Sequence, residues 1–231
     1  MKKISIIIPT YNERLNIVRL LSALTRTMKK FNYEIIVVDD NSPDGTSSVV
    51  SAYSNKNHRV RLVKRINERN LSSAIISGFE EARGSTFVVM DADLSHDPEI
   101  LPEMVKNINK GYDIVIGSRR IKGGGAENWP FYRKIQSDIA TMLARLFIGV
   151  KIKDPMSGFF ALKRDLYINS KHRLNSQGYK ILLEIYAKSN PKNIKEIPFI
   201  FRNRSHGYSK LTRKVVIQYL KMLFDIRFRE P

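Results

Sequence analysis

The sequence predicts an α/β fold, in which helices flank a mostly parallel β-sheet on both faces. The first observation is that four short apolar runs each end in polar side chains, at Pro9–Glu13, Asp39–Asp40, Asp91–Asp93 and Arg119. The second is that stretches with helical periodicity separate these runs, at about residues 13–30, 43–54, 70–83 and 98–110. Ligands bind beyond the carboxyl ends of the strands in such sheets. We therefore expect the four polar strand ends to form one site.

The first run, Ile4–Ile8, stands near the N-terminus but is too short for a signal peptide, and Pro9 and Glu13 follow it at once. We therefore interpret it as the first strand. The third run leads into Asp91 and Asp93, and strand geometry would point these two carboxylates to the same side. Two neighbouring anions need a cation or a raised pKa. Mg²⁺ or Mn²⁺ carrying a diphosphate would meet that need, and an acidic exit from a strand is the plainer alternative.

The strand–helix alternation changes near residue 120, where three glycines, Gly123–Gly125, predict a mobile connection. This segment is either a hinge or lid at the edge of the site or a plain surface loop. Apolar residues at helical spacing predict a helix over Lys134–Gly149. A turn at Asp154 then leads into a strand, a helix follows from Gly178, and Pro198 makes Ile194–Phe201 an edge strand.

The last predicted helix, Val215–Phe228, is apolar except for one narrow stripe formed by Gln218, Lys221 and Asp225. Such a helix is buried in a core, lies in a membrane interface or docks on another apolar surface. Its terminal position and the basic residues around it, which include Arg213, Lys214 and Arg229, favour the membrane interface. We therefore expect a C-terminal amphipathic interface helix.

Length, composition and charge limit the classes of protein to which the chain can belong. A chain of 231 residues is suited to one domain, the lack of cysteine excludes disulfides and thiolate chemistry, and no apolar run is long enough to span a membrane. The formal net charge is +18, and residues 116–231 carry 24 of the 40 Lys and Arg but only 8 of the 22 Asp and Glu. The second half therefore favours an anionic partner, which could be nucleic acid, a bilayer or a phosphorylated substrate.

The motifs together resemble a known family. They are PTYNE from Pro9, VDDNSPDGT from Val38, MDADLSH from Met90, GSR from Gly117, ENWPFYRK from Glu127 and DPMSGFFAL from Asp154. In these the chain resembles the GT-A family 2 glycosyltransferases, and among them the dolichol-phosphate (polyprenyl-phosphate) mannose synthases, from Ile4 to about Leu211. The resemblance implies a GT-A, Rossmann-like fold. It also implies inverting transfer of mannose from GDP-mannose to dolichyl or polyprenyl phosphate, giving dolichyl β-D-mannosyl phosphate and GDP.

The resemblance also implies roles for individual residues. The nucleoside would be held by Pro9, Tyr11, Glu13, Val38 and Asp40. The ribose-diphosphate would meet Asp91, Ala92 and Asp93, and a divalent cation, Mg²⁺ or Mn²⁺, would bind Asp91, Asp93 and Ser95. The donor would also contact Arg119, Lys180, Arg204 and Lys210. The acceptor phosphate would bind Arg119, Arg133 and Ser137, and the catalytic set would be Asp93, Arg119 and Arg133.

The expected organisation follows from the same resemblance. Residues 1–120 would bind the nucleotide sugar, 121–211 would be the acceptor-binding half of the same domain, and 212–231 would form the membrane-proximal helix. The protein would act at the cytoplasmic face of a membrane, either as a peripheral protein or anchored by a small transmembrane subunit or by a transmembrane domain absent from this sequence. Nucleic acid is not an expected partner.

Three alternatives stay open at this stage. A related enzyme could use a UDP-sugar, such as UDP-glucose, with a polyprenyl phosphate. A basic nucleic-acid-binding module would explain the charge, but the chain lacks a stacking motif with interleaved aromatic residues, and its acidic strand ends would repel a phosphate backbone. A catalytically silent scaffold is the third, and the carboxylates and arginines present at Asp91, Asp93, Arg119 and Arg133 argue against it.

Overall fold

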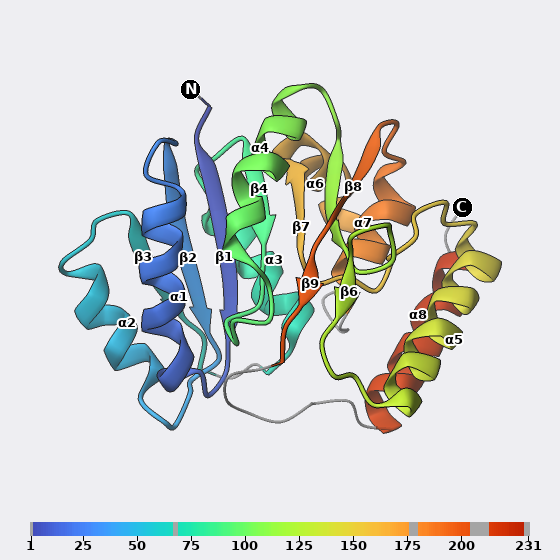
Figure 1. The fold of residues 1–231 in the computed structure, drawn as a ribbon, viewed down its shortest axis with the longest axis horizontal. Coiled ribbons are helices and arrows are strands. Elements are labelled where there is room, and N and C mark those ends of the chain that lie inside the picture. Colours follow the sequence, from blue (N-terminus) through green and yellow to red (C-terminus); the bar gives the residue numbers. More distant parts are fainter. Residues whose placement is uncertain (1, 67–68, 176–179, 204–212, 229–231) are drawn as a thin grey trace.

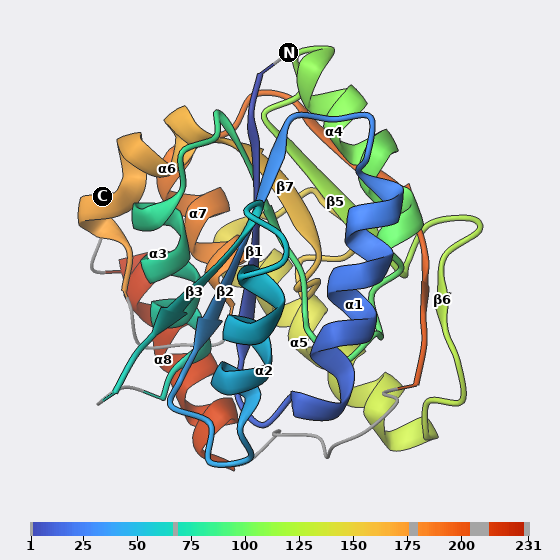
Figure 2. The same cartoon turned by 90° about the vertical axis from the view of Figure 1, so that its left-hand side faces the viewer.

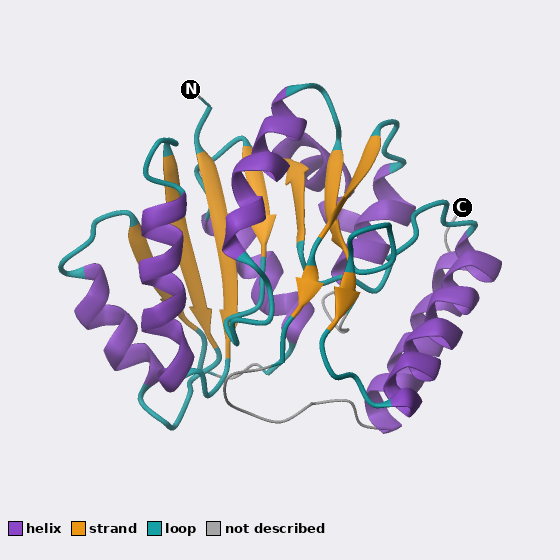
Figure 3. Cartoon of the chain, in the orientation of Figure 1, coloured by secondary structure: helices purple, strands orange, loops and turns teal. Residues whose placement is uncertain are grey.

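The computed structural model describes residues 2–66, 69–175, 180–203 and 213–228. Its centre is a seven-stranded sheet in the order β3-β2-β1-β4-β7-β5-β8 (Figures 1 and 3). These strands are β1 (Ile4–Thr10), β2 (Tyr33–Asp39), β3 (Val60–Lys64), β4 (Thr86–Val89), β5 (Ile114–Ser118), β7 (Phe160–Lys163) and β8 (Ile194–Pro198). Only β7 runs antiparallel to its neighbours, β4 and β5. The α/β fold with a mostly parallel sheet is therefore confirmed.

Helices cover both faces of the sheet (Figures 1 and 2). They are α1 (Arg14–Thr27), α2 (Thr46–Ser54), α3 (Leu71–Glu81), α4 (Leu101–Asn109), α5 (Phe131–Ile148), α6 (Arg164–Ser170), α7 (Ile181–Ser189) and α8 (Arg213–Phe228). Short 3₁₀ turns, η1 (Pro98–Ile100) and η2 (Lys171–Arg173), precede α4 and follow α6. A second, two-stranded sheet pairs β6 (Gly125–Ala126) with β9 (Ile200–Phe201).

The sheet strands form because both of their faces can be buried. Along β1 the side chains alternate between two cores: Ile6 and Ile8 pack with α1 and α4, whereas Ile7 packs with α3 and α7. This alternation is the two-residue period of a strand, and burial on both faces explains why β1 and β2 read as continuous β-branched runs. The parallel pairing of β1 with β2 brings Thr10 level with Asp39, so that both strands end at one edge.

Helices α5 and α8 lie side by side at the end of the molecule away from α1 and α2 (Figures 1 and 2). Met222 and Leu223 of α8 and Ala144 of α5 are buried in the core that also contains α3 and α7. The Tyr219 hydroxyl donates a hydrogen bond of 2.6 Å to the carbonyl oxygen of Ala140. The predicted C-terminal helix is confirmed, and it combines one packed side with one exposed apolar side.

Some elements differ from the sequence expectations. The strand expected through Asp93 ends at Val89, so Asp91 and Asp93 lie in the following loop. The edge strand expected over 194–201 is two strands, because β8 ends the main sheet at Pro198 and β9 pairs with β6. The short strand β3 and the helix α6 were not expected. In β3 only Val60 is fully buried, so the strand carries almost no apolar pattern.

The glycine segment forms an ordered turn that leads into β6. Gly123 has a φ of +88°, and a Cβ on Gly124 would collide with the carbonyl oxygen of Ser118. The glycines therefore allow close packing against the end of β5. None of the helices in the described ranges combines the length and apolar character needed to cross a bilayer.

We predict that Gly78→Ala destabilises the fold. A Cβ at this position of α3 would lie 2.5 Å from Cγ2 of Ile7 in β1. Alanine gains about 1 kcal/mol of helix propensity, but overpacking costs about 1–3 kcal/mol, so we expect a net loss of up to about 2 kcal/mol. Urea unfolding measures this loss. The neighbouring Ser77→Ala is the control, with a change below about 0.5 kcal/mol, and a stabilised Gly78→Ala variant would contradict the packing.

Candidate active site

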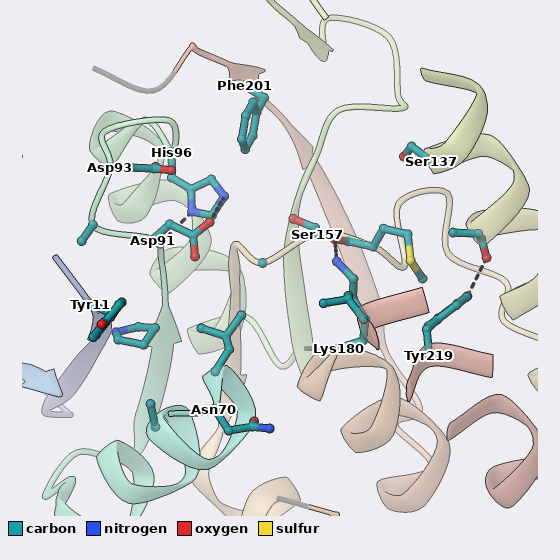
Figure 4. A pocket seen from close by; sticks show the side chains of 18 of the residues that line it. Tyr11, Asn70, Asp91, Asp93, His96, Ser137, Ser157, Lys180, Phe201 and Tyr219 are labelled. Atoms are coloured by element: carbon teal, nitrogen blue, oxygen red, sulfur yellow. Dashed lines mark hydrogen bonds and ion pairs between the residues drawn. The ribbon is translucent and has the colours of Figure 1, made fainter. Parts of the chain in front are cut away.

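One cavity of about 850 Å³ opens at the carboxyl edge of the sheet (Figure 4). It collects side chains from the ends of β1, β2, β4 and β5 and from α3, α5, α7 and α8. Among the residues that the sequence singled out, its lining includes Pro9, Tyr11, Glu13, Asp40, Asp91, Ala92, Asp93, Arg119, Arg133, Ser137 and Lys180. Val38 and Ser95 are buried beside it, and Arg204 and Lys210 lie outside the described residues.

The loop after β2 is built around Asp39, whose side chain is fully buried. Its Oδ1 accepts hydrogen bonds from the hydroxyls of Thr10 (3.1 Å) and Ser42 (2.5 Å), and its Oδ2 accepts from the Ser47 hydroxyl (2.5 Å). Asp39 is therefore engaged with the protein itself. It holds the loop in a fixed shape and leaves the adjacent Asp40 to face the cavity.

The same loop caps the start of α1. The backbone N–H of Asn12 donates to the Ser42 hydroxyl, and that of Glu13 donates to the Thr46 hydroxyl, each at 2.9 Å. The backbone N–H of Arg14 donates to the Asp44 carboxylate at 3.0 Å. These contacts satisfy donors that a helix terminus otherwise leaves without partners, and they fix the ends of β1 and β2 against each other.

Asp40 has a partner that the sequence did not indicate, the buried Arg65 just after β3. Nε of Arg65 donates to Oδ1 of Asp40 at 2.7 Å, and its Nη1 donates to the Ser73 hydroxyl at 2.7 Å. A guanidinium with several fixed partners holds a carboxylate in one orientation. Nearby, the Arg69 guanidinium lies 4.8 Å from the centre of the Tyr11 ring.

Asp91 and Asp93 are held by the turn that follows β4, where Leu94 adopts a φ of +64°. Within this turn the Ser95 hydroxyl donates to Oδ1 of Asp93 at 2.5 Å, and the Asp91 backbone N–H donates to Nδ1 of His96 at 3.0 Å. His96 is buried and stacks on Phe159, with ring centres 4.8 Å apart. Burial lowers the pKa of His96, so the neutral ring carries its proton on Nε2, which lies 3.7 Å from the Asp91 carboxylate.

The donor set suits a hard divalent cation that also binds a diphosphate. Within the described ranges, no group of three His, Cys, Asp or Glu side chains is placed to hold a metal. Mg²⁺ and Mn²⁺ sites of this class need only one or two carboxylates, since the phosphates complete the shell. Asp91 and Asp93 could supply those two, and their role as ligands stays a prediction. Ser95 is fully buried and donates to Asp93, a geometry that orients the carboxylate, and its role as a ligand stays a prediction.

Arg119, at the end of β5, is fixed by the fully buried Asp154. Its Nε and Nη2 donate to the two carboxylate oxygens at 2.7 Å each, and its backbone N–H donates at 2.9 Å. These bonds with Arg119 outweigh the burial of Asp154 and keep the pKa of its carboxyl below 3.8, its ordinary value. A bidentate pair of this kind sets the guanidinium in one plane at the edge of the cavity.

Lys180 precedes α7, and its Nζ donates to the carbonyl oxygen of Met156 at 3.1 Å (Figure 4). Loss of water contact, together with the nearby Arg119 guanidinium, lowers the pKa of Lys180 to about 8. The nearby carboxylates of Asp91 and Asp154 offset this effect only in part, so a further anion would stabilise the ammonium. Lys180 and Arg119 line the same cavity as Asp91 and Asp93.

The other end of the cavity is formed by α5 and α8. Arg133 and Ser137 of α5 line it, and Arg120 donates to the Ser137 hydroxyl at 2.9 Å. Beyond them the lining becomes apolar, with Ile139, Val216 and Met222. The cavity thus passes from carboxylates, through cations, to an apolar end.

Comparison with known proteins shows the family to which the chain belongs. A family model described as "Glycosyl transferase family 2" matches residues 5–170. The chain is 47% identical over 226 residues to a protein of Pyrococcus furiosus named dolichol-phosphate mannosyltransferase, covering 97% of this chain but 63% of that protein. It is 43% identical to the Saccharomyces cerevisiae protein of the same name, covering 96% of this chain and 86% of that one.

A solved structure shares the fold at lower identity. Glucosyl-3-phosphoglycerate synthase from Mycobacterium tuberculosis, in complex with phosphoglyceric acid, superposes with a TM-score of 0.72 at 17% identity. The match covers 98% of this chain and 80% of that one. This likeness concerns the fold alone, which is of the GT-A type.

We predict that the Arg119–Asp154 pair stabilises the fold in a pH-dependent way. Asp154→Asn leaves the guanidinium without its counter-charge and should cost about 3 kcal/mol or more at pH 7. Since the pKa of Asp154 is lower in the folded protein than unfolded, the stabilising effect is complete above pH 3.8 and is lost as the pH falls through the folded pKa. Urea unfolding between pH 7 and pH 3 measures the difference between wild type and variant.

The control for this prediction is Asp138→Asn. Asp138 pairs with Arg120 at 2.6 Å, but its side chain is half exposed. Its loss should cost less than about 1 kcal/mol, as for other surface pairs. A wild-type advantage over Asp154→Asn that grows as the pH falls would contradict the assignment.

Proposed function

The chain belongs to glycosyl transferase family 2, and from this premise we propose that it transfers mannose from GDP-mannose to the phosphate of dolichol or another polyprenol. The products would be dolichyl β-D-mannosyl phosphate and GDP, with inversion at the sugar. The name dolichol-phosphate mannosyltransferase, borne by relatives that are 40–47% identical, supports the acceptor and the sugar. Since the chain spans 63% of the Pyrococcus furiosus relative, the activity of the whole protein remains a proposal.

One observation carries this proposal: Asp40, Asp91, Asp93, Arg119 and Arg133 line a single cavity. A sugar nucleotide brings a base, a diphosphate and a sugar, and the acceptor brings a second phosphate. The cavity offers carboxylates for base and metal at one end, and cations between these and its apolar end. Its volume of about 850 Å³ falls within the usual range for ligand pockets.

At the donor end, the nucleoside would be bound between the ends of β1 and β2. We propose that Asp40 accepts N–H groups of the base while Arg65 keeps its carboxylate in place, and that Tyr11 contacts the nucleoside. Pro9, Glu13 and Val38 would complete this pocket. Carboxylate recognition suits guanine, because guanine presents adjacent N–H donors.

Asp91 and Asp93 would hold Mg²⁺ or Mn²⁺, and the bound cation would supply charge stabilisation to the departing diphosphate. Ala92 would contact the ribose-diphosphate, and Lys180 and Arg119 would add their charges to the same oxygens. Arg204 and Lys210 are assigned to the donor by resemblance and lie outside the described residues. Asp93, Arg119 and Arg133 would form the catalytic set.

The acceptor needs little activation. A phosphate monoester already carries a negatively charged oxygen near neutral pH, so the attack on the sugar requires positioning rather than a strong base. Arg119 and Arg133 would bind this phosphate, and the Ser137 hydroxyl would add a hydrogen bond. In agreement with this, the buried His96 is engaged with Asp91, and no step is assigned to it.

An exposed apolar surface on α5 and α8 supports attachment to a membrane. We call it the α5–α8 surface, and it consists of Phe131, Tyr132, Ile135, Ile139, Met142 and Leu146 of α5 with Val216, Ile217, Leu220, Phe224 and Phe228 of α8, all more than a third exposed. Groups of exposed apolar side chains on neighbouring helices often mark interaction sites. We propose that this surface rests in the interface of the bilayer that contains the isoprenoid acceptor.

Each part of the chain is then assigned a separate role in the proposed reaction. We assign the nucleotide sugar to residues 1–120, the acceptor to residues 121–211 of the same domain, and the membrane contact to the helix in residues 212–231. The exposed Lys221 and Arg227 of α8 suit the anionic cytoplasmic leaflet, so we place the enzyme at the cytoplasmic face. A small transmembrane subunit or a further transmembrane segment would complete the anchor.

The deciding assay is transfer of radiolabelled mannose from GDP-mannose to dolichyl phosphate. We expect butanol-extractable product with Mg²⁺ or Mn²⁺, none with EDTA, and much less from UDP-glucose. Asp91→Asn should lower kcat/KM by at least about a hundredfold, because metal charge stabilisation supplies several kcal/mol. The exposed Asp165→Asn is the control. Undiminished transfer in EDTA would remove the metal from the proposal, and UDP-glucose as the better donor would reassign the sugar.

Membrane attachment is tested separately by flotation with liposomes that contain anionic lipid. The double variant Leu146→Glu, Ile217→Glu places charges on two side chains that are 73% and 66% exposed, one on each helix. We expect at least about a tenfold loss of liposome binding, since burying one such side chain is worth about 1.5–3 kcal/mol. Leu15→Glu on α1 is the matched control, being 66% exposed at the opposite end of the molecule. Equal flotation of the wild type, the double variant and Leu15→Glu would exclude the α5–α8 surface as the membrane contact.

A further inference from the structure

We propose that Trp129 is the positioning residue of the acceptor site, where its indole ring holds the guanidinium groups of Arg119 and Arg133 beside one another for a phosphate. This inference rests on the proposed function and deepens it. Trp129 lies between β6 and the first turn of α5, and it lines the same cavity as both arginines.

Two aromatic rings, Trp129 and Phe201, lie beside the guanidinium groups of both arginines. The guanidinium carbons of Arg119 and Arg133 lie 5.1 Å and 4.4 Å from the centre of the Trp129 ring. The same two carbons lie 5.7 Å and 5.8 Å from the ring of Phe201. Trp129 and Phe201 meet edge to face at 5.6 Å. Both arginines therefore share the same two rings, although they come from different elements, β5 and α5.

Two like charges brought together need compensation. Asp154 compensates Arg119 but also takes up part of its hydrogen-bonding capacity. An aromatic face attracts a guanidinium by about 0.5–2 kcal/mol without occupying its N–H donors in the plane. The rings can thus hold both cations and leave donors for a ligand. Within the described residues, Nη1 of Arg119 has no hydrogen-bond partner.

The ring is itself held in place by the small second sheet. Ala126 pairs with Phe201 across β6 and β9, which sets the Trp129 loop against the aromatic cluster. Within the part of the chain that the structure covers, the buried indole Nε1 has no hydrogen-bond partner. Phenylalanine would therefore keep the aromatic face and lose no hydrogen bond, whereas leucine would keep the apolar volume and lose the π face. These two variants separate cation binding from simple packing.

The first test uses the wild-type chain, because Trp129 is its single tryptophan. Its fluorescence is followed during titration with farnesyl phosphate, below the concentration at which this probe forms micelles. We expect a saturable change that farnesol does not produce and that Arg133→Ala weakens by at least about tenfold. If farnesyl phosphate is proven to bind and the fluorescence of Trp129 does not change, the inference is overturned.

The second test compares Trp129→Phe with Trp129→Leu in the transfer assay. We expect Trp129→Phe to keep the KM for lipid phosphate within about threefold. Trp129→Leu should raise it at least about tenfold, which is the loss of about 1.4 kcal/mol of binding. The KM for GDP-mannose should change by less than about threefold, because Asp154 still holds Arg119. Thermal melting checks that both variants fold. Equal KM values for Trp129→Leu and wild type, or equal defects in the two variants, would reject the role of the π face.

The two tests separate this inference from the proposed function. A fluorescence response to farnesyl phosphate without any mannose transfer would overturn the proposed reaction and leave the phosphate site standing. Mannose transfer that is unaffected in Trp129→Leu would leave the reaction standing and overturn the positioning role.

Discussion

The site depends on the buried ion pair between Arg119 and Asp154. Asp154 is fully buried, and its own backbone N–H donates to Glu196 of β8 at 3.0 Å. The pair thus connects the end of β5, the loop before β7 and the edge strand β8. A buried carboxylate is tolerated only with a partner of opposite charge and good geometry, so the loop and the guanidinium fix each other. Arg133 lies over the same Trp129 ring as Arg119, and burial together with the Arg119 guanidinium lowers the pKa of Lys180.

The charges in the cavity are ordered along its length. Carboxylates from the ends of β2 and β4 occupy one end, and Lys180, Arg119 and Arg133 follow toward α5. Burial and the Arg119 guanidinium lower the pKa of Lys180, so an anion beside its ammonium would be stabilising. A diphosphate with its divalent cation would bring negative charge to the cations and positive charge to Asp91 and Asp93. Such a ligand therefore matches the order of the charges along the cavity.

The sequence predicted which residues at the strand ends line the site, but it did not predict the side chains that hold these residues in place. The residues that line the cavity could be predicted because parallel strands bring their carboxyl ends to one edge, whatever the side-chain details. Arg65 could not be predicted as the partner of Asp40, because it lies 25 positions away, just after a half-buried strand with little apolar pattern. Asp39 looked equivalent to Asp40, and only the hydroxyls of Thr10, Ser42 and Ser47 reveal its inward role. The hydrogen bond from Ser95 to Asp93 could not be predicted either, because hydrogen bonds within a turn produce no periodic pattern in the sequence.

In the proposed function, helix α5 would link recognition of the phosphate to the membrane. One side of it carries Arg133 and Ser137 into the cavity, and its exposed side carries Met142 and Leu146. A helix fixes the relative height of these residues, with a rise of about 1.5 Å per residue. If the exposed side rests in the bilayer interface, the arginine is held at a constant depth, near the headgroups where the phosphate of an isoprenoid lies. Selection of the acceptor then follows from where the phosphate is presented, and the site needs no contact along the length of the lipid chain.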